Sequence, residues 1–357
     1  MDHDVSGLHH VGHVVTDMGQ ALGLYRRLGF TLPPPSCPAL PAVVGAPAEP
    51  FGAANTHVYF PRNFIELVTV VGDGATGRVP ADARLVPLRV PDDRLPGLVA
   101  AVRGTAANLA ACLRRFEGMH ILMFDSPDLD GAAVRLRADG VGHGGVHTVR
   151  RPVETAGGTR TEPVRYLEID GPGPGMARGR VPEGRVGFAG DPAPEVAEAR
   201  WHMDHPNGAV DLLGCVMCVE DAELPEVERR YERYLGRPAR RAGPVRVFDL
   251  EGAEVVLVAG SALAGLLPGE RAPALPAFVA YTVAVRDLAA TGRLLRETGV
   301  PLGRTAAGEI FVPARAALGV AIVFRQESRV PSAGSSSGET GGGAAVAGTA
   351  GRPERRP

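Results

Sequence analysis

A carboxylate and an imidazole stand in two segments that are otherwise apolar. Glu66 lies in the run Phe64–Val71, where an unpaired carboxylate would cost several kcal/mol, so we expect a cationic partner for it. His10 lies in an earlier run that ends at Asp17. A single strand histidine is as often a hydrogen-bonded or surface residue as a ligand, but together with Glu66 it becomes a candidate metal ligand.

The composition describes a globular chain and excludes several kinds of chemistry. Of the 357 residues, 45% are apolar and 22% are charged, and the length is sufficient for two domains with their own cores. The formal net charge of -2 leaves no basic surface for nucleic acid or for an anionic membrane. All 38 basic residues are arginine, which excludes a lysine Schiff base and a lysine-containing phosphate loop.

Targeting and redox features favour a cytoplasmic protein. The sequence shows no unbroken apolar run of about 18 residues, so we expect no membrane-spanning helix, and residues 1–4 do not begin a signal peptide. Four cysteines do not form a disulfide framework in a chain of this length. Cys215 and Cys218 are three residues apart on an expected strand, so they point to opposite faces and read as buried thiols.

One pattern of helix start and stop signals occurs four times along the chain. Each time an apolar, strand-like run leads to an aspartate, then to a helical pattern, and then to a glycine. The pairs are Asp17 with Gly29, Asp128 with Gly140, Asp221 with Gly236, and Asp287 with Gly299. Aspartate accepts hydrogen bonds from the first helical turn, and glycine ends the last turn in the left-handed conformation. The pattern therefore predicts four helices, each preceded by a strand.

Two or three short strand candidates follow each helix, so each unit is a βαβββ module. The fold class we predict is α+β, with four modules paired into two cupped mixed sheets, because a single module cannot bury its own sheet. Residues 72–118 interrupt the spacing and contain a helix at about 98–115, which we interpret as a lid or a packing strut. Residues 328–357 are rich in Gly, Ser and Ala, and we expect a disordered tail.

Two segments resemble the vicinal oxygen chelate superfamily of glyoxalases, extradiol dioxygenases, fosfomycin-resistance enzymes and bleomycin-binding proteins. These are LHHVGHVVTD at residues 8–17 and NFIEL at residues 63–67, similar to that superfamily's opening strand with its His and closing strand with its Glu. The resemblance covers about residues 7–326. Residues 204–209, DHPNGA, are similar to segments of its broad glyoxalase-like branch. We therefore expect an N-terminal half at residues 7–200 and a C-terminal half at 201–327.

The resemblance implies a metal site in the N-terminal half. Its ligands would be His10, Glu66 and His120. His10 lies seven residues before Asp17, whereas His120 lies eight residues before Asp128, so the second strand must accommodate one additional residue. The second closing strand has Ala189 or Gly190 where glyoxalase-like members place another acid. By strand alternation His9 and His13 would face away from His10.

Two imidazoles and one carboxylate form the facial triad that suits Fe(II), which we favour, and also Zn, Mn, Ni or Co. The resemblance then implies an enzyme that binds a small oxygenated organic substrate through neighbouring oxygens, with oxygenase or isomerase/lyase chemistry. The alternative is a metal-free small-molecule binding or drug-sequestering protein like the bleomycin binders. In both cases the partner is a small molecule, not nucleic acid or membrane, and the chain is a monomer or a homodimer.

Four further residues are candidates for substrate binding: Asn55, His57, Arg150 and Arg165. An arginine could hold a substrate carboxylate in a bidentate manner, although a solvated surface position is the alternative for each. In the C-terminal half, Gly214 and Ala280 occupy the positions of the ligand histidines, and Glu254 is the ionisable residue of the closing strands. We expect that half to be structural and to lack a metal.

Overall fold

The computed structural model describes residues 4–41, 47–71, 80–88, 93–155, 158–173, 175–190 and 203–327, with the backbone alone described at 41, 150–155 and 158–161. Residues Met1–Glu327 form one compact unit. The predicted tail at 328–357 lies outside the described residues.

The helix of each module begins at the aspartate that the sequence pattern predicts, with one exception. Helices α1 (Met18–Arg27), α3 (Leu129–Ala138) and α7 (Leu288–Glu297) are capped by Asp17, Asp128 and Asp287, each accepting a hydrogen bond from the first helical turn. The four expected glycines all have positive φ, from 64° to 81°.

The predicted capping role of Asp221 is wrong. Helix α5 (Leu224–Leu235) begins after Glu223, with Pro225 in its first turn and no side-chain cap. Asp221 instead accepts hydrogen bonds from the backbone N–H and the hydroxyl of Ser261, at 3.0 Å and 2.5 Å. Proline favours the first turn of a helix because its fixed φ suits that position and its missing N–H would be unpaired there.

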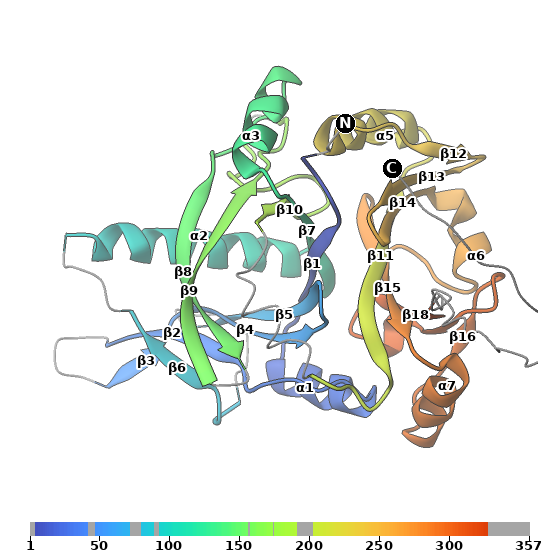
Figure 1. Cartoon of the computed structure of the whole chain (residues 1–357), viewed down its shortest axis with the longest axis horizontal. Coiled ribbons are helices and arrows are strands. Elements are labelled where there is room, and N and C mark those ends of the chain that lie inside the picture. Colours follow the sequence, from blue (N-terminus) through green and yellow to red (C-terminus); the bar gives the residue numbers. More distant parts are fainter. Residues whose placement is uncertain are drawn as a thin grey trace, which may run out of the picture. The chain divides into compact units, whose positions relative to one another are not determined.

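The first sheet contains two modules and part of the insertion. Its strands are β1 (Leu8–Val14), β2 (Ser36–Pro41), β3 (Ala48–Pro50), β4 (Gly52–Tyr59), β5 (Phe64–Val71), β6 (Arg84–Pro87), β7 (Gly118–Asp125), β8 (His147–Thr155), β9 (Gly158–Glu168) and β10 (Arg185–Ala189). Their order is β3-β2-β4-β5-β1-β7-β10-β9-β8, with β6 paired to β2 (Figure 1). The central strands β1 and β7 are antiparallel, and each has a parallel neighbour, β5 or β10.

The second sheet repeats this arrangement. It contains β11 (Ala209–Val219), β12 (Arg240–Ala242), β13 (Val245–Leu250), β14 (Ala253–Ala259), β15 (Ala277–Val285), β16 (Gly303–Arg304), β17 (Ile310–Val312) and β18 (Ala321–Gln326). Their order is β12-β13-β14-β11-β15-β18-β17-β16. Short helical turns complete this half: η1 (Gly260–Ala262), α6 (Leu263–Leu266) and η2 (Ala314–Ala316). Two curled mixed sheets built from four modules confirm the predicted α+β architecture.

The inserted helix α2 (Leu95–Leu113) packs on the first sheet. Leu109 of α2 is 1% exposed and lies in one apolar cluster with Val14, Val68, Ile121 and Met123. Alternation along β1 and β5 puts Val14 and Val68 on the same side as His10 and Glu66, and we call this side the site face. The helix contacts β4, β5 and β1, beside which it runs in Figure 1.

Among the described helices, α2 is the one that is long and apolar enough to cross a membrane by length and composition. The helix contains Arg103 and Asn108, so it is not an unbroken apolar run, and the expectation of no membrane-spanning helix stays a prediction. The core helix of a soluble protein can meet the same criterion. In the structure, the C-terminal part of α2 buries Leu109, Ala111 and Cys112.

The face opposite the site face forms the core between the two halves. His13 Nε2 donates a hydrogen bond to the Leu318 carbonyl at 2.8 Å, and its Nδ1 lies 2.8 Å from the Tyr25 hydroxyl. Tyr25 is hydrogen-bonded in turn to Tyr281 of β15. All three ring side chains are fully buried. A continuous hydrogen-bonded chain thus joins β1, α1 and two segments of the C-terminal half.

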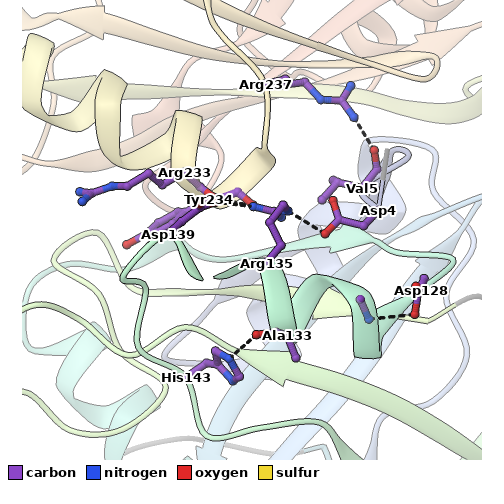
Figure 2. Close-up of polar contacts among 11 residues, drawn as sticks. Asp4, Val5, Asp128, Ala133, Arg135, Asp139, His143, Arg233, Tyr234 and Arg237 are labelled. Carbon is purple, nitrogen blue, oxygen red and sulfur yellow. Dashed lines mark hydrogen bonds and ion pairs between the residues drawn. The ribbon is translucent and has the colours of Figure 1, made fainter. Parts of the chain in front are cut away.

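Arg135 of α3 makes a second connection between the halves (Figure 2). Its guanidinium donates to Asp4 at 2.7 Å and to the carbonyls of Arg233 and Tyr234 at 2.7 and 2.8 Å. Those carbonyls belong to the last turn of α5, where the helix lacks its own donors and where a positive charge is favoured.

Candidate metal and substrate site

His10 and Glu66 face each other across two neighbouring parallel strands. In the register of β1 and β5, His10 pairs with Phe64 and Gly12 pairs with Glu66, so both side chains project from the site face. His10 Nε2 lies 3.9 Å from Glu66 Oε2. Their side chains are 12% and 11% exposed, which places the pair in a largely dry environment. The structure therefore brings together two of the three predicted ligands.

Neighbouring side chains fix the orientation of both groups. Asn55 Nδ2 of β4 donates a hydrogen bond to Glu66 Oε1 at 2.8 Å. The Nδ1 atoms of His9 and His10 lie 2.7 Å apart, so one of them donates to the other. The His10 ring also stacks on Phe64, with ring centroids 4.5 Å apart. One side of each group is thus engaged, while His10 Nε2 and Glu66 Oε2 remain next to each other.

The predicted outward orientation of His9 is wrong. Between Leu8 and His10, β1 advances two residues while β7 advances only one, from Phe124 to Met123. His9 is the extra residue of this β-bulge, and a bulge interrupts the alternation of side chains. Its ring consequently contacts the rings of His10 and Phe64, at centroid distances of 5.0 and 5.2 Å.

His57 lies on the edge of the same group. It pairs with Glu66 in the register of β4 and β5, and its ring meets Phe64 edge-on at 4.9 Å. The Tyr59 hydroxyl lies 2.9 Å from His57 Nδ1. Of the substrate-binding candidates, Asn55 and His57 are therefore the two that the structure places beside His10 and Glu66. Asn55 is engaged in orienting the carboxylate.

The structure does not bring His120 to this pair. In β7, His120 is the extra residue of a second bulge, because Gly12 pairs with Ile121 while His13 pairs with Met119. Its Nε2 donates to the Phe116 carbonyl at 2.9 Å, and its Nδ1 is buried without a hydrogen-bond partner among the described residues. Burial lowers the pKa of His120 to about 4; the charge of Arg115 acts in the same direction, while the backbone groups of Phe116 and Glu183 oppose the shift.

Ile121 and Gly187 occupy the positions in the second module that His10 and Glu66 occupy in the first. Ile121 lies seven residues before Asp128, as His10 lies seven before Asp17. Glu66 pairs with the residue two after His10, and Gly187 likewise pairs with Met123, two after Ile121. The position of the missing acid is thus Gly187 rather than Ala189 or Gly190. Within the described ranges, no group of three His, Cys, Asp or Glu residues is arranged to hold a metal ion.

Arg185 adds a positive charge to the site face. It pairs with Ile121 in the register of β10 and β7, and its Nε donates to Glu168 Oε1 at 2.9 Å. Burial alone would lower the pKa of Arg185, but Glu168, with a contribution from Glu66, raises it. Arg185 therefore stays charged and offsets part of the Glu66 charge.

The two other substrate-binding candidates do not join this group. Arg165 is exposed, and its Nη2 donates to both carboxylate oxygens of Asp130 at 2.9 Å, on the outer side of α3. Arg150 lies in β8, but its side chain is outside the described part.

The corresponding face of the second sheet is apolar. Leu263 and Leu267 pack against Val258, Val279 and Val323, which forms a closed hydrophobic cluster. Glu254 is bonded to Arg325 at 2.9 Å.

Comparison with known proteins agrees with this architecture. A sequence model of the family described as "Glyoxalase-like domain" matches residues 8–235. No curated protein matches the chain. A hypothetical protein from Staphylococcus aureus is similar in structure, with a TM-score of 0.55 and 9% identity, over 90% of this chain and 99% of that one.

A mutant of 4-hydroxymandelate synthase from Streptomyces coelicolor also has a TM-score of 0.55, with 14% identity, over 90% of this chain and 92% of the other. At these identities the similarity shows a shared fold.

Proposed function

Because the chain belongs to the glyoxalase-like domain family, within the vicinal oxygen chelate superfamily, we propose that it is a metal-dependent enzyme whose reaction centre is the His10–Glu66 pair. Its substrate would be a small organic molecule that offers two neighbouring oxygens. The observation that carries the proposal is the distance of 3.9 Å between His10 Nε2 and Glu66 Oε2, two groups oriented by different neighbours.

The donor atoms fit one divalent cation. With metal–ligand bonds of about 2.0–2.2 Å, two donors on one ion lie roughly 3–4 Å apart. His10 has its other ring nitrogen hydrogen-bonded to His9, which is the usual arrangement around a ligating histidine. When bound, such a cation would polarise the substrate oxygens as a Lewis acid. With two protein ligands, the other coordination positions would belong to water and substrate.

The chain's own residues would prepare this centre. Asn55 keeps the Glu66 carboxylate in place, and Phe64 fixes the plane of the His10 ring. The α2 cluster around Leu109 excludes water from the neighbouring part of the site face. Arg185 offers a permanent positive charge on the same face, which favours a substrate that carries or develops negative charge.

A metal-free binding protein is the second candidate. The observation that favours it is the presence of Ile121 and Gly187 at the second module's ligand positions, together with the charge of Arg185 near Glu66. In that case the site face would hold an apolar or anionic small molecule without a cation.

Metal analysis separates the two candidates. Protein purified without chelators should contain a divalent metal in near-stoichiometric amount, and Glu66→Ala should lower that amount at least tenfold. Glu254→Ala is the matched control, because it removes a carboxylate from the equivalent sheet of the other half. Unchanged metal content in Glu66→Ala would disprove the site, and wild-type protein without metal would favour the binding protein.

The type of chemistry needs a separate test. Fe(II) is the metal we favour, since a site with few protein ligands leaves room for substrate and dioxygen together. Anaerobic loading with Fe(II) followed by nitric oxide should then give the electron paramagnetic resonance signal of an iron–nitrosyl complex. Tight binding of Zn or Ni, no binding of Fe(II), and turnover without oxygen would instead indicate an isomerase or lyase.

A further inference from the structure

A cavity of about 420 Å³, widely open to solvent, lies between α1 and the loops of the C-terminal half. Leu24 lines it from α1, Pro273 from the segment before β15, and Leu318 from the segment after η2. Helix α1 packs on the face of the first sheet opposite the site face, with Leu22 and Tyr25 in the core that includes Val11. The cavity is therefore separated from His10 and Glu66 by the first sheet itself.

Three exposed arginines from three different segments are among the residues that line this cavity: Arg27, Arg271 and Arg315. None of them has an ion pair or a hydrogen bond within the described part of the chain. Like charges that converge on one hollow repel one another, and an anion between them relieves that repulsion.

One carboxylate, Glu117, lines the cavity, and a second, Glu270, is adjacent in sequence to a lining residue; both accept hydrogen bonds from backbone groups. Glu117 Oε1 accepts from the backbone N–H and the hydroxyl of Thr16, at 2.7 and 2.6 Å. Glu270, next in sequence to Arg271, accepts from the Ala314 N–H at 3.3 Å, and its charge acts on Arg315. The three guanidinium groups outnumber these carboxylates, so the cavity keeps an excess of positive charge.

The remaining walls define what else a ligand should carry. Leu24, Pro273 and Leu318 give the cavity an apolar side, and its volume is in the range of small-molecule sites. Arginine forks bind carboxylate and phosphate oxygens in a bidentate manner.

We propose that this cavity binds a small organic anion in which a phosphate or carboxylate group is attached to an apolar body. The charged group meets Arg27, Arg271 and Arg315, and the apolar body lies against Leu24 and Leu318. This site is independent of the His10–Glu66 pair and of any metal there.

The ligand would bridge the two halves of the molecule. Arg27 belongs to the first half, whereas Arg271 and Arg315 belong to the second. Leu318, which also lines the cavity, accepts the hydrogen bond from His13 through its carbonyl. Because a ligand that binds only the folded state stabilises it, the anion should raise the melting temperature as well as give a binding signal.

Isothermal titration calorimetry with phenyl phosphate and with benzoate tests the proposal. We expect saturable one-to-one binding of at least one probe with a Kd of about 1 mM or tighter. The Arg271→Gln/Arg315→Gln double variant should weaken it at least tenfold. Arg26→Gln is the matched control, because Arg26 lies in the same helical turn as Arg27 but does not line the cavity, and it should leave the Kd within twofold. The probe with the lower Kd identifies phosphate or carboxylate as the preferred group.

Either of two results would overturn the proposal. One is the absence of saturable binding of both probes up to about 10 mM. The other is an equal loss of affinity in Arg26→Gln and in the double variant, since general surface charge would then account for the binding. Thermal melting of each variant without probe shows whether the fold is retained.

Discussion

His9 and His120 are both extra residues in β-bulges of the same strand pair, and the two bulges have different consequences. The bulge in β1 turns His9 toward His10, and the Nδ1 atoms of the two rings are hydrogen-bonded. The bulge in β7 leaves Ile121 opposite Gly12 and buries His120 against Phe116. The one-residue bulge in each strand thus determines that the His9 ring lies against His10 and that the His120 ring does not.

Replacement of His9 tests its role as a positioning residue. His9→Phe keeps an aromatic ring against Phe64 but removes the bond to His10 Nδ1, and loss of such a partner typically costs about 10–100-fold in metal affinity. We expect metal affinity to fall at least tenfold, measured by competition with a chromophoric chelator. His9→Gln, whose amide can still bond to His10, should recover most of it. Wild-type affinity in His9→Phe would show that His9 serves packing alone.

His13 makes stability depend on pH. Burial lowers the pKa of His13 from 6.5 to about 4, so between these values the folded protein keeps it neutral while the unfolded chain takes up a proton. Its contribution is fully present above pH 6.5 and is lost as the pH falls toward 4. The loss reaches about 2 kcal/mol by roughly pH 5.

Urea denaturation of the wild type and of His13→Gln between about pH 7.5 and pH 5 measures this contribution. The variant is expected to be less stable at neutral pH, because the bonds to Tyr25 and Leu318 change, but its stability should fall less steeply with acid. Equal slopes for the two proteins would mean that His13 does not carry the effect.

Part of the site could be predicted from residue types. Glu66 in an apolar strand and His10 seven residues before a helix cap are local patterns, and the structure places the two side by side. The bulges could not be predicted, because alternation assumes a regular register and a bulge depends on the partner strand. Counting seven residues back from Asp128 does reach Ile121, so the spacing itself held a signal against His120.

At the scale of elements, α2 covers part of the site face. The sequence predicted a helix at about 98–115, and the structure has it at Leu95–Leu113. Its position on the sheet rests on contacts with residues far away in the sequence, which periodicity does not reveal. The interpretation as a packing strut is supported by the burial of Leu109 among β1, β5 and β7 side chains.

Truncation of Leu109 tests this packing. Leu109→Ala should destabilise the protein by about 2–5 kcal/mol, the usual range for a buried leucine, as measured by urea denaturation. Leu98→Ala, at a partly exposed position near the start of the same helix, should cost much less. Equal small effects would show that α2 is not anchored on the site face.

At the scale of the whole molecule, the four modules could be predicted from the residues that start and end their helices, since aspartate caps and left-handed glycines act locally. The exception is α5, which begins at Leu224 with Pro225 in its first turn and is not capped by Asp221. The contacts that join the halves, such as Tyr25 with Tyr281, could not be predicted, because they link residues remote in the sequence.

Arg135 provides a test of how firmly the halves are joined. Arg135→Met removes hydrogen bonds to Asp4 and to two carbonyls at the end of α5, and should cost about 1–3 kcal/mol in unfolding free energy. Arg137→Met is the control on the same helix, since Arg137 is exposed and should tolerate the change. An equal loss of unfolding free energy in both variants would show that Arg135 has no special role in joining the halves.

The most direct test of the site is a calorimetric titration of the metal-free protein with Zn²⁺ or, in the absence of oxygen, with Fe²⁺. We expect His10→Ala and Glu66→Ala each to weaken binding at least tenfold, because their donor atoms lie 3.9 Å apart on the site face. His120→Ala should bind the metal as the wild type does, since His120 is bonded to Phe116 away from that pair. Loss of the metal in His120→Ala, with retention in Glu66→Ala, would contradict this assignment.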